Sequence, residues 1–78
     1  MTQILKQGDR GALVSLLQLE LKRAGQAPGA LDGIFGAQTA AAVRAFQAAN
    51  GLTPDGIAGA RTHHALLPYY TGFVTRTI

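Results

Sequence analysis

Asp32 and Asp55 are the residues whose type could support catalysis, because a pair of carboxylates can act as acid and base in glycoside hydrolysis. Both stand at the start of the same pattern, Asp-Gly-Ile-x-Gly-Ala-x-Thr. An acid and a base need different surroundings to hold their pKa values apart. Two identical turns do not offer such a difference, so we interpret both aspartates as turn residues and predict no catalytic residue.

His63 and His64 are the side chains that raise the question of a metal site. Adjacent residues on a helix point about 100° apart, so they cannot easily share one ion. The chain has no cysteine, and no third ligand has helical spacing to the histidines. Ser15 has no histidine or acid at motif spacing, and the glycines lack the lysine and serine of a phosphate loop. We therefore expect no metal, no cofactor and no nucleophile.

An internal repeat is the most specific feature of the chain. Residues 32–39 recur as residues 55–62, an offset of 23 residues (55 − 32). A second echo relates residues 14–18 to residues 43–47 and places Gln18 and Gln47 at equivalent positions. Such repeats usually mark repeated supersecondary units. The structural turn residues are Asp32, Gly33, Gly36, Thr39, Asp55, Gly56, Gly59 and Thr62.

Each member of the repeat has an expected structural role. The aspartates accept hydrogen bonds from backbone N–H groups two or three residues on, and the glycine that follows permits positive φ. Ile34 and Ile57 are expected to point inward as hydrophobic anchors. Thr39 and Thr62 lie in a first helical turn, where a hydroxyl can bond free backbone groups. The repeat is thus predicted to cap two helices and to set their angle.

Three helices should position these turns. Apolar spacings of three and four predict a helix over residues 12–24, with Glu20, Lys22 and Arg23 mostly off its apolar stripe and Gly25 as its stop. Two further helices are predicted over residues 37–49, before Asn50-Gly51, and from about residue 59 or 60 to 67, before Pro68. Asp9 is a possible cap of the first helix. We predict an all-α, orthogonal three-helix bundle with long ordered Asp-Gly turns.

Composition narrows the possible partners. The chain has 78 residues and a formal net charge of +3, and its basic residues form no run, which argues against a nucleic-acid partner. No apolar stretch reaches the roughly 18 residues that a membrane span needs. No secretion signal is visible at the start, so work outside the cell would require another export route.

The ordered series of motifs resembles the peptidoglycan-binding type 1 domain that is attached to bacterial cell-wall hydrolases. The resemblance covers residues 5–67, about four fifths of the chain. Its motifs are Leu5-Lys6-Gln7-Gly8, Leu17-Gln18, Leu31-Asp32-Gly33-Ile34-Phe35-Gly36, Ala42-Val43-Arg44-Ala45-Phe46-Gln47, Asn50-Gly51-Leu52 and Asp55-Gly56-Ile57-Ala58-Gly59. The resemblance implies a three-helix fold, a groove for wall glycan or stem peptide, and a separate catalytic domain. One departure is His63, where the family often has tryptophan.

Residues that differ between the two repeats, or that lie at helix ends, are the candidate ligand contacts. Sugars and peptides are recognised by polar groups set around an apolar floor. The alternative for each polar residue is a cap or a solvated surface position, and for Gln47 a structural hydrogen bond shared with Gln18. The candidates are Phe35, Gln38, Gln47, Asn50, Thr53, Arg61 and His63.

The sequence therefore predicts a binding domain over residues 1–68 and a tail or linker over residues 69–78. We expect a monomer that binds peptidoglycan in the cell wall or the extracellular or periplasmic space. It would target a catalytic domain or work beside a second wall-binding domain. One alternative is a protein-interaction or scaffolding module that has lost wall affinity. A small hydrolase is the other alternative, but it lacks a recognisable catalytic set.

Overall fold

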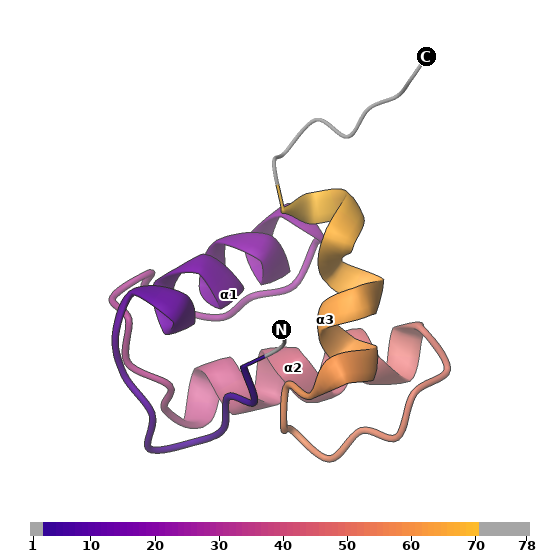
Figure 1. Cartoon of the computed structure of the whole chain (residues 1–78), viewed down its shortest axis with the longest axis horizontal. Helices are drawn as coiled ribbons and strands as arrows, with labels where there is room; N and C mark the ends of the chain where they lie inside the picture. The colour runs from indigo at the N-terminus through magenta and orange to yellow at the C-terminus, as the bar shows by residue number, and fades with distance from the viewer. Residues whose placement is uncertain (1–2, 71–78) are drawn as a thin grey trace.

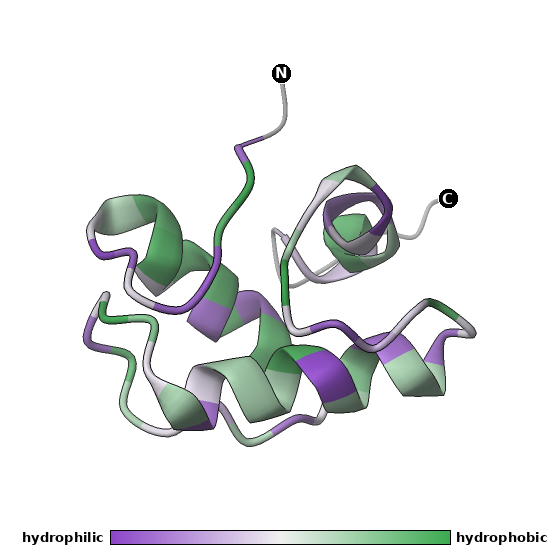
Figure 2. Cartoon of the chain, turned by 90° about the horizontal axis from the view of Figure 1, so that it is seen from below, coloured by the Kyte–Doolittle hydropathy of each residue, from purple (hydrophilic) through white to green (hydrophobic). Residues whose placement is uncertain are grey.

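The computed structural model describes residues 3–70, and these form three helices and a final turn of 3₁₀ helix. The elements are α1 (Ala12–Arg23), α2 (Ala37–Ala49), α3 (Ala60–Leu66) and η1 (Leu67–Tyr69). Helix α3 stands across α2 in Figure 1, and Figure 2 looks almost along α3 while α2 lies across the view. The predicted all-α fold is confirmed. No helix within residues 3–70 is long and apolar enough to span a bilayer.

Helices α1 and α2 end with the same backbone motif, and glycine supplies it in both. Gly25 has φ 93°, and the N–H groups of Gly25 and Gln26 donate to the carbonyls of Lys22 and Leu21. At the end of α2, Gly51 has φ 72°, and the corresponding bonds reach back to Ala48 and Gln47. Positive φ is strained for residues with a Cβ, so glycine at these positions fixes where each helix stops.

The start of α1 differs from prediction. Its N-cap is Gly11, which has no side chain to cap the helix. The Asp9 carboxylate instead accepts a hydrogen bond of 2.9 Å from the backbone N–H of Lys6. The predicted cap is therefore wrong, because Asp9 is used to close the tight turn that precedes the helix.

The core lies between the three helices and is filled mainly by aliphatic side chains and two phenylalanines. Phe46 of α2 is 2% exposed, as predicted from its helical spacing to Val43. Ala40 and Ala42 are buried and permit a close approach to α2, whereas Ala45 is exposed. The buried apolar residues are Leu5, Val14, Leu17, Leu21, Phe35, Ala40, Ala42, Val43, Phe46, Ala58 and Leu66.

One charged residue of α1 also lies in the interior. Lys22 and Arg23 are exposed as predicted, but Glu20 is only 7% exposed. The apolar stripe of α1 indicates only the face of this helix that packs on the core. A second side of this helix shares a groove with residues from the N-terminal segment and from η1, which the pattern of α1 alone does not reveal.

The two isoleucines of the repeat point outward, so the predicted anchors are wrong. Ile34 is 47% exposed and Ile57 is 41% exposed. The next residues, Phe35 and Ala58, are buried instead. Successive side chains in extended backbone point to opposite sides, so a shift of one residue exchanges the buried and exposed positions.

Two isolated backbone bridges attach the N-terminal segment to the turns. Leu5 and Ala58 exchange hydrogen bonds of 3.2 and 2.8 Å, and Arg10 forms a bridge to Ile34. These single pairs form no strand within residues 3–70. They tie the start of the domain to the residues that precede α2 and α3.

The chain packs on the core beyond Pro68. Helix α3 ends at Leu66, and Pro68 lies inside η1. The ring of Tyr69 meets Phe46 edge to face at 6.3 Å, and the Arg23 guanidinium donates to the carbonyls of Tyr69 and Tyr70. The predicted tail begins with Tyr69, which is partly buried and packs against the core. Tyr70 is described and exposed, and the remaining tail positions, residues 71–78, lie outside the described residues.

Candidate binding groove along the third helix

Gln18 of α1 organises the first Asp-Gly turn from a buried position. Its Nε2 donates to Asp32 Oδ1 at 3.2 Å, to the Ile34 carbonyl at 3.0 Å and to Thr39 Oγ1 at 3.0 Å. Its Oε1 accepts from the backbone N–H of Gly33 at 2.9 Å. Thr39 in turn donates to the Pro28 carbonyl at 3.3 Å. One amide therefore holds the whole turn against α1.

Gln47 of α2 makes the same bonds to the second turn. Its Nε2 donates to Asp55 Oδ1 at 2.9 Å, to the Ile57 carbonyl at 2.9 Å and to Thr62 Oγ1 at 3.0 Å. Its Oε1 accepts from the Gly56 N–H at 3.0 Å. The two turns are copies of one hydrogen-bonded unit. Both glutamines therefore have a structural role.

Both aspartates are held as carboxylates in matching environments. The pKa of Asp32 is lowered first by the backbone N–H of Ile34, two residues on, and then by the Gln18 amide. The pKa of Asp55 is lowered in the same way by Ile57 and Gln47. Neither aspartate caps a helix, because the N-caps of α2 and α3 are glycines without a side-chain bond. The arrangement offers two equivalent anions and no general acid.

The predicted contact residues separate into buried and exposed groups. Phe35 is 1% exposed and Gln47 is 2% exposed, so both side chains belong to the interior and leave the set of contacts that we propose. Asn50 is exposed at the end of α2, where its Nδ2 donates to the Phe46 carbonyl at 2.9 Å. Gln38 is exposed beside the first turn and lines a separate hollow there.

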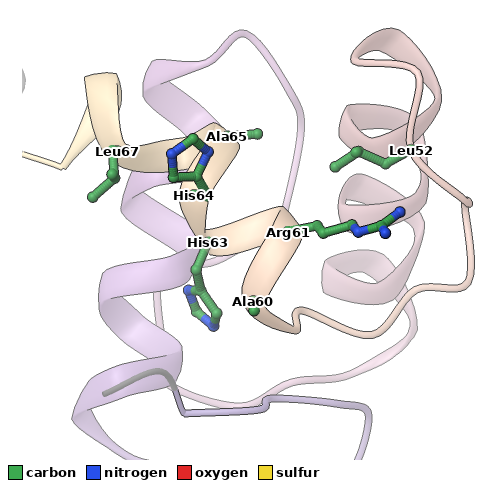
Figure 3. A pocket seen from close by; sticks show the side chains of 7 residues that line it. All are labelled: Leu52, Ala60, Arg61, His63, His64, Ala65 and Leu67. Atoms are coloured by element: carbon green, nitrogen blue, oxygen red, sulfur yellow. The ribbon is translucent and has the colours of Figure 1, made fainter.

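The remaining candidates gather around α3. A groove, here called the α3 groove, is lined by Leu52, Ala60, Arg61, His63, His64, Ala65 and Leu67. Figure 3 shows Arg61 and Ala65 extending from α3 toward Leu52. The His63 ring points toward the N-terminal segment instead, and its Nε2 lies 2.7 Å from the Gln3 carbonyl oxygen.

The α3 groove continues into a hollow at the second turn. Leu52, Ala60 and Arg61 line both, and the hollow adds Thr53 and Asp55. Leucine and alanine supply an apolar surface between these polar groups. Arg61 is exposed beside it and can offer a planar pair of donors to a carboxylate. The combination suits a small ligand with an anionic end.

Sequence reasoning found Thr53, Arg61 and His63 but missed Leu52, His64 and Ala65. Residues 61, 64 and 65 follow helical spacings of three and four, so they share one face of α3. This shared face of α3 could be recognised from the spacing of these residues in the sequence alone. The position of Leu52 opposite this face depends on how α2 and α3 pack, which no local pattern reveals.

The sequence of this chain matches a known protein family. Residues 10–66 match the family described as "Putative peptidoglycan binding domain", and the chain belongs to that family. The match includes both Asp-Gly turns and ends with α3.

Relatives and solved structures agree with this membership. The chain is 43% identical over 65 residues to the spore cortex-lytic enzyme of Bacillus cereus, covering 83% of this chain and 25% of the enzyme. The crystal structure of the SleB N-terminal domain is 40% identical with a TM-score of 0.83, covering 90% of this chain and 96% of that one. The Burkholderia AP3 phage endolysin is 49% identical with a TM-score of 0.81, covering 83% and 25%. The chain thus spans about a quarter of the length of the enzymes that it matches.

Proposed function

We propose that this chain binds bacterial cell-wall peptidoglycan without cleaving it and brings an attached or partner cell-wall enzyme to its substrate. The observation that carries this proposal is its membership of the peptidoglycan-binding family. Relatives that are named as lytic enzymes contain a matching stretch that occupies about a quarter of their length. Such proteins act on the wall, so the chain is proposed to work there, outside the cytoplasmic membrane.

The α3 groove is the proposed binding site. Arg61 would hold a carboxylate of a stem peptide, since guanidinium groups bind carboxylates through two parallel hydrogen bonds. Leu52, Ala60 and Ala65 would contact the aliphatic parts of the same peptide. Such a shallow site offers few buried anchors and modest affinity. Attachment to a repeating polymer, together with other modules, would raise the overall avidity.

A binding role without hydrolysis is supported by the equivalence of Asp32 and Asp55. Both carboxylates have lowered pKa values with the same causes, so neither is set up as a proton donor. The repeat that first raises the question of a glycosidase is used to build the fold.

Co-sedimentation with insoluble peptidoglycan tests the proposal. The protein is expected to pellet with purified sacculi and to stay in solution with cellulose, while no soluble wall fragments are released. Equal recovery on the two polymers would contradict peptidoglycan binding. Release of fragments by the chain alone would contradict the non-catalytic role.

A scaffolding module that lacks wall affinity is the alternative, and His63 is the observation that favours it. The family often has tryptophan there, whereas this side chain is half-buried and lies beside the Gln3 carbonyl. An amide NMR titration with soluble muropeptides discriminates between the two. Shifts at Leu52, Arg61 and Ala65 support wall binding, and their absence at saturating muropeptide supports scaffolding.

A further inference from the structure

A second groove lies on the other side of α3 and has a different character. It runs between α1, the N-terminal segment and η1, and it is called here the Glu20 groove. Its walls are formed by Leu5, Leu13, Leu16, Leu67 and Tyr70, and Glu20 is the only carboxylate among the described residues that line it. Leu13, Leu67 and Tyr70 are each at least half exposed, so the walls remain open to a ligand.

Glu20 is a buried residue whose carboxylate is unpaired within residues 3–70 and is accessible from this groove. The side chain is 7% exposed, and no hydrogen bond to it exists within residues 3–70. In the same residues, no fully enclosed polar side-chain atom lacks a partner, so the carboxylate oxygens must reach the open groove. A carboxylate removed from bulk water without a partner is costly. A carboxylate that is found in such a position despite this desolvation cost is a candidate for binding a cation.

The Arg23 guanidinium does not pair with Glu20. Arg23, one turn further along α1, influences Glu20 through its charge, but its guanidinium donates to the carbonyls of Tyr69 and Tyr70 at 3.3 and 3.0 Å. His63 of α3 also lines the groove, with its Nε2 beside the Gln3 carbonyl oxygen. Tyr70 is the remaining titratable group among the described residues that line it. Within residues 3–70, no side chain pairs with the Glu20 oxygens, so they are open to a group supplied by a ligand.

We propose that the Glu20 groove binds a free aliphatic ammonium group of the peptidoglycan stem peptide, with Glu20 as counter-ion and the leucines around the methylene chain. This inference rests on the proposed function for the identity of the polymer. A diamino acid that is not cross-linked carries such a group at the end of an apolar chain. Long amines place their methylenes on an apolar surface and their charge beside a polar partner. In this groove the leucines would contact the methylenes, and Glu20 would contact the ammonium group.

The two grooves then complement each other in charge. The α3 groove presents Arg61 and suits a carboxylate, whereas the Glu20 groove presents an anion. Burial raises the pKa of Glu20 to about 7, with Arg23 acting in the opposite direction. An ammonium group binds the ionised form, so its binding should weaken as the pH falls below about 7.

The first experiment uses two small probes and needs no wall. An amide NMR titration compares Nα-acetyl-lysine methylamide with Nα-acetyl-norleucine methylamide, which has a similar apolar chain without the amine. The lysine probe is expected to shift Leu16, Glu20 and Leu67 with about tenfold higher affinity, the effect of a charged hydrogen bond. Glu20→Gln should remove this preference. Asp9→Asn, the same charge change outside the groove, should keep it. Equal affinities for the two probes in the unmodified protein would overturn the inference.

The second experiment tests the source of the amine. Sacculi are treated with acetic anhydride to block their amino groups, and binding is compared with untreated sacculi. The unmodified protein should bind the acetylated wall about tenfold more weakly, and Glu20→Gln should bind both preparations alike. Equal binding of the unmodified protein to both walls would overturn the inference and leave the proposed function standing. Binding to neither wall would instead overturn the proposed function.

Discussion

Gln18 of α1 and Gln47 of α2 stand at equivalent positions, and each closes one Asp-Gly turn with the same four hydrogen bonds. Each amide uses one nitrogen for three acceptors and one oxygen for a backbone N–H. The turn therefore depends on the preceding helix as much as on its own residues.

Replacing Gln47 with leucine should destabilise the fold severely. The substitution keeps the approximate size of the side chain but leaves the Gly56 N–H, the Ile57 carbonyl and Thr62 short of a partner. We expect a loss of about 3 kcal/mol in the free energy of unfolding, measured by urea denaturation. Gln7→Leu, the same change at an exposed position, should cost less than about 0.5 kcal/mol. Similar losses at the two positions would contradict the role of Gln47.

Alanine should be tolerated less well at Gly33 than at Gly56, although both have φ 77°. A Cβ at Gly33 would lie 2.8 Å from Ser15 Oγ and 3.0 Å from the Gly11 carbonyl oxygen. A Cβ at Gly56 would first meet the movable end of Arg44, at 3.0 Å. We expect losses of about 3 kcal/mol for Gly33→Ala and about 1 kcal/mol for Gly56→Ala. Ser15→Ala should recover part of the loss caused by Gly33→Ala and none of the loss caused by Gly56→Ala. Equal losses for the two glycine variants would rule out this account.

Glu20 should make the protein less stable as the pH rises through the weakly acidic range. Its pKa is about 7 in the folded protein against an ordinary value of 4.5, so the folded state binds more protons between these values. The free energy of unfolding should therefore fall from about pH 4.5 to pH 7, by about 1–2 kcal/mol because water in the groove screens the charge. Denaturation at several pH values checks this. Glu20→Gln should abolish the decrease and Asp9→Asn should not.

Asp32 and Asp55 should act in the opposite direction at lower pH. Their folded pKa values lie below the ordinary 3.8, so their contribution is complete above that pH and is lost as the pH falls through the folded values. Asparagine keeps the oxygen that accepts the N–H two residues on. A variant with both Asp32→Asn and Asp55→Asn should therefore lose stability less steeply below about pH 4. An unchanged acid transition would show that other groups control it.

Arg61→Ala should weaken binding to sacculi by about tenfold, because a charged hydrogen-bonding group is lost from the α3 groove. Arg61→Lys should recover part of the affinity, since lysine keeps the charge without the paired donors. Lys22→Ala removes an exposed cation from α1 and should leave binding unchanged. If all three variants bind alike, the wall contacts another surface.

The helices were predictable because their signals are local. Spacings of three and four located α1 and α2 to within a residue, and the Gly25 and Asn50-Gly51 stops fixed their ends. The turns were predictable only in part. The repeat identified Asp32 and Asp55 as acceptors, but it could not decide whether Ile34 or Phe35 faces inward, because that depends on which side of the extended segment meets α1.

The grooves depend on contacts between distant segments, so the sequence indicated single residues and not surfaces. Arg61 was found because it differs from Gln38 at the equivalent repeat position. Leu52 was missed because its place beside α3 follows from helix packing. The spacing in α1 places Glu20 mostly off the apolar stripe, and nothing local shows that η1 and the N-terminal segment reach its side of the helix.

The bridge between Leu5 and Ala58 joins residues that are 53 positions apart (58 − 5). A nascent chain cannot form it until the residues that precede α3 have left the ribosome. Because contacts of such long range carry a high loop-closure cost, they tend to form late in folding. The apolar Leu5 then remains unburied until residue 58 has emerged. We therefore expect this domain to fold in a late step, after residue 58 has emerged, and its unfolded segment to be available to chaperones until then.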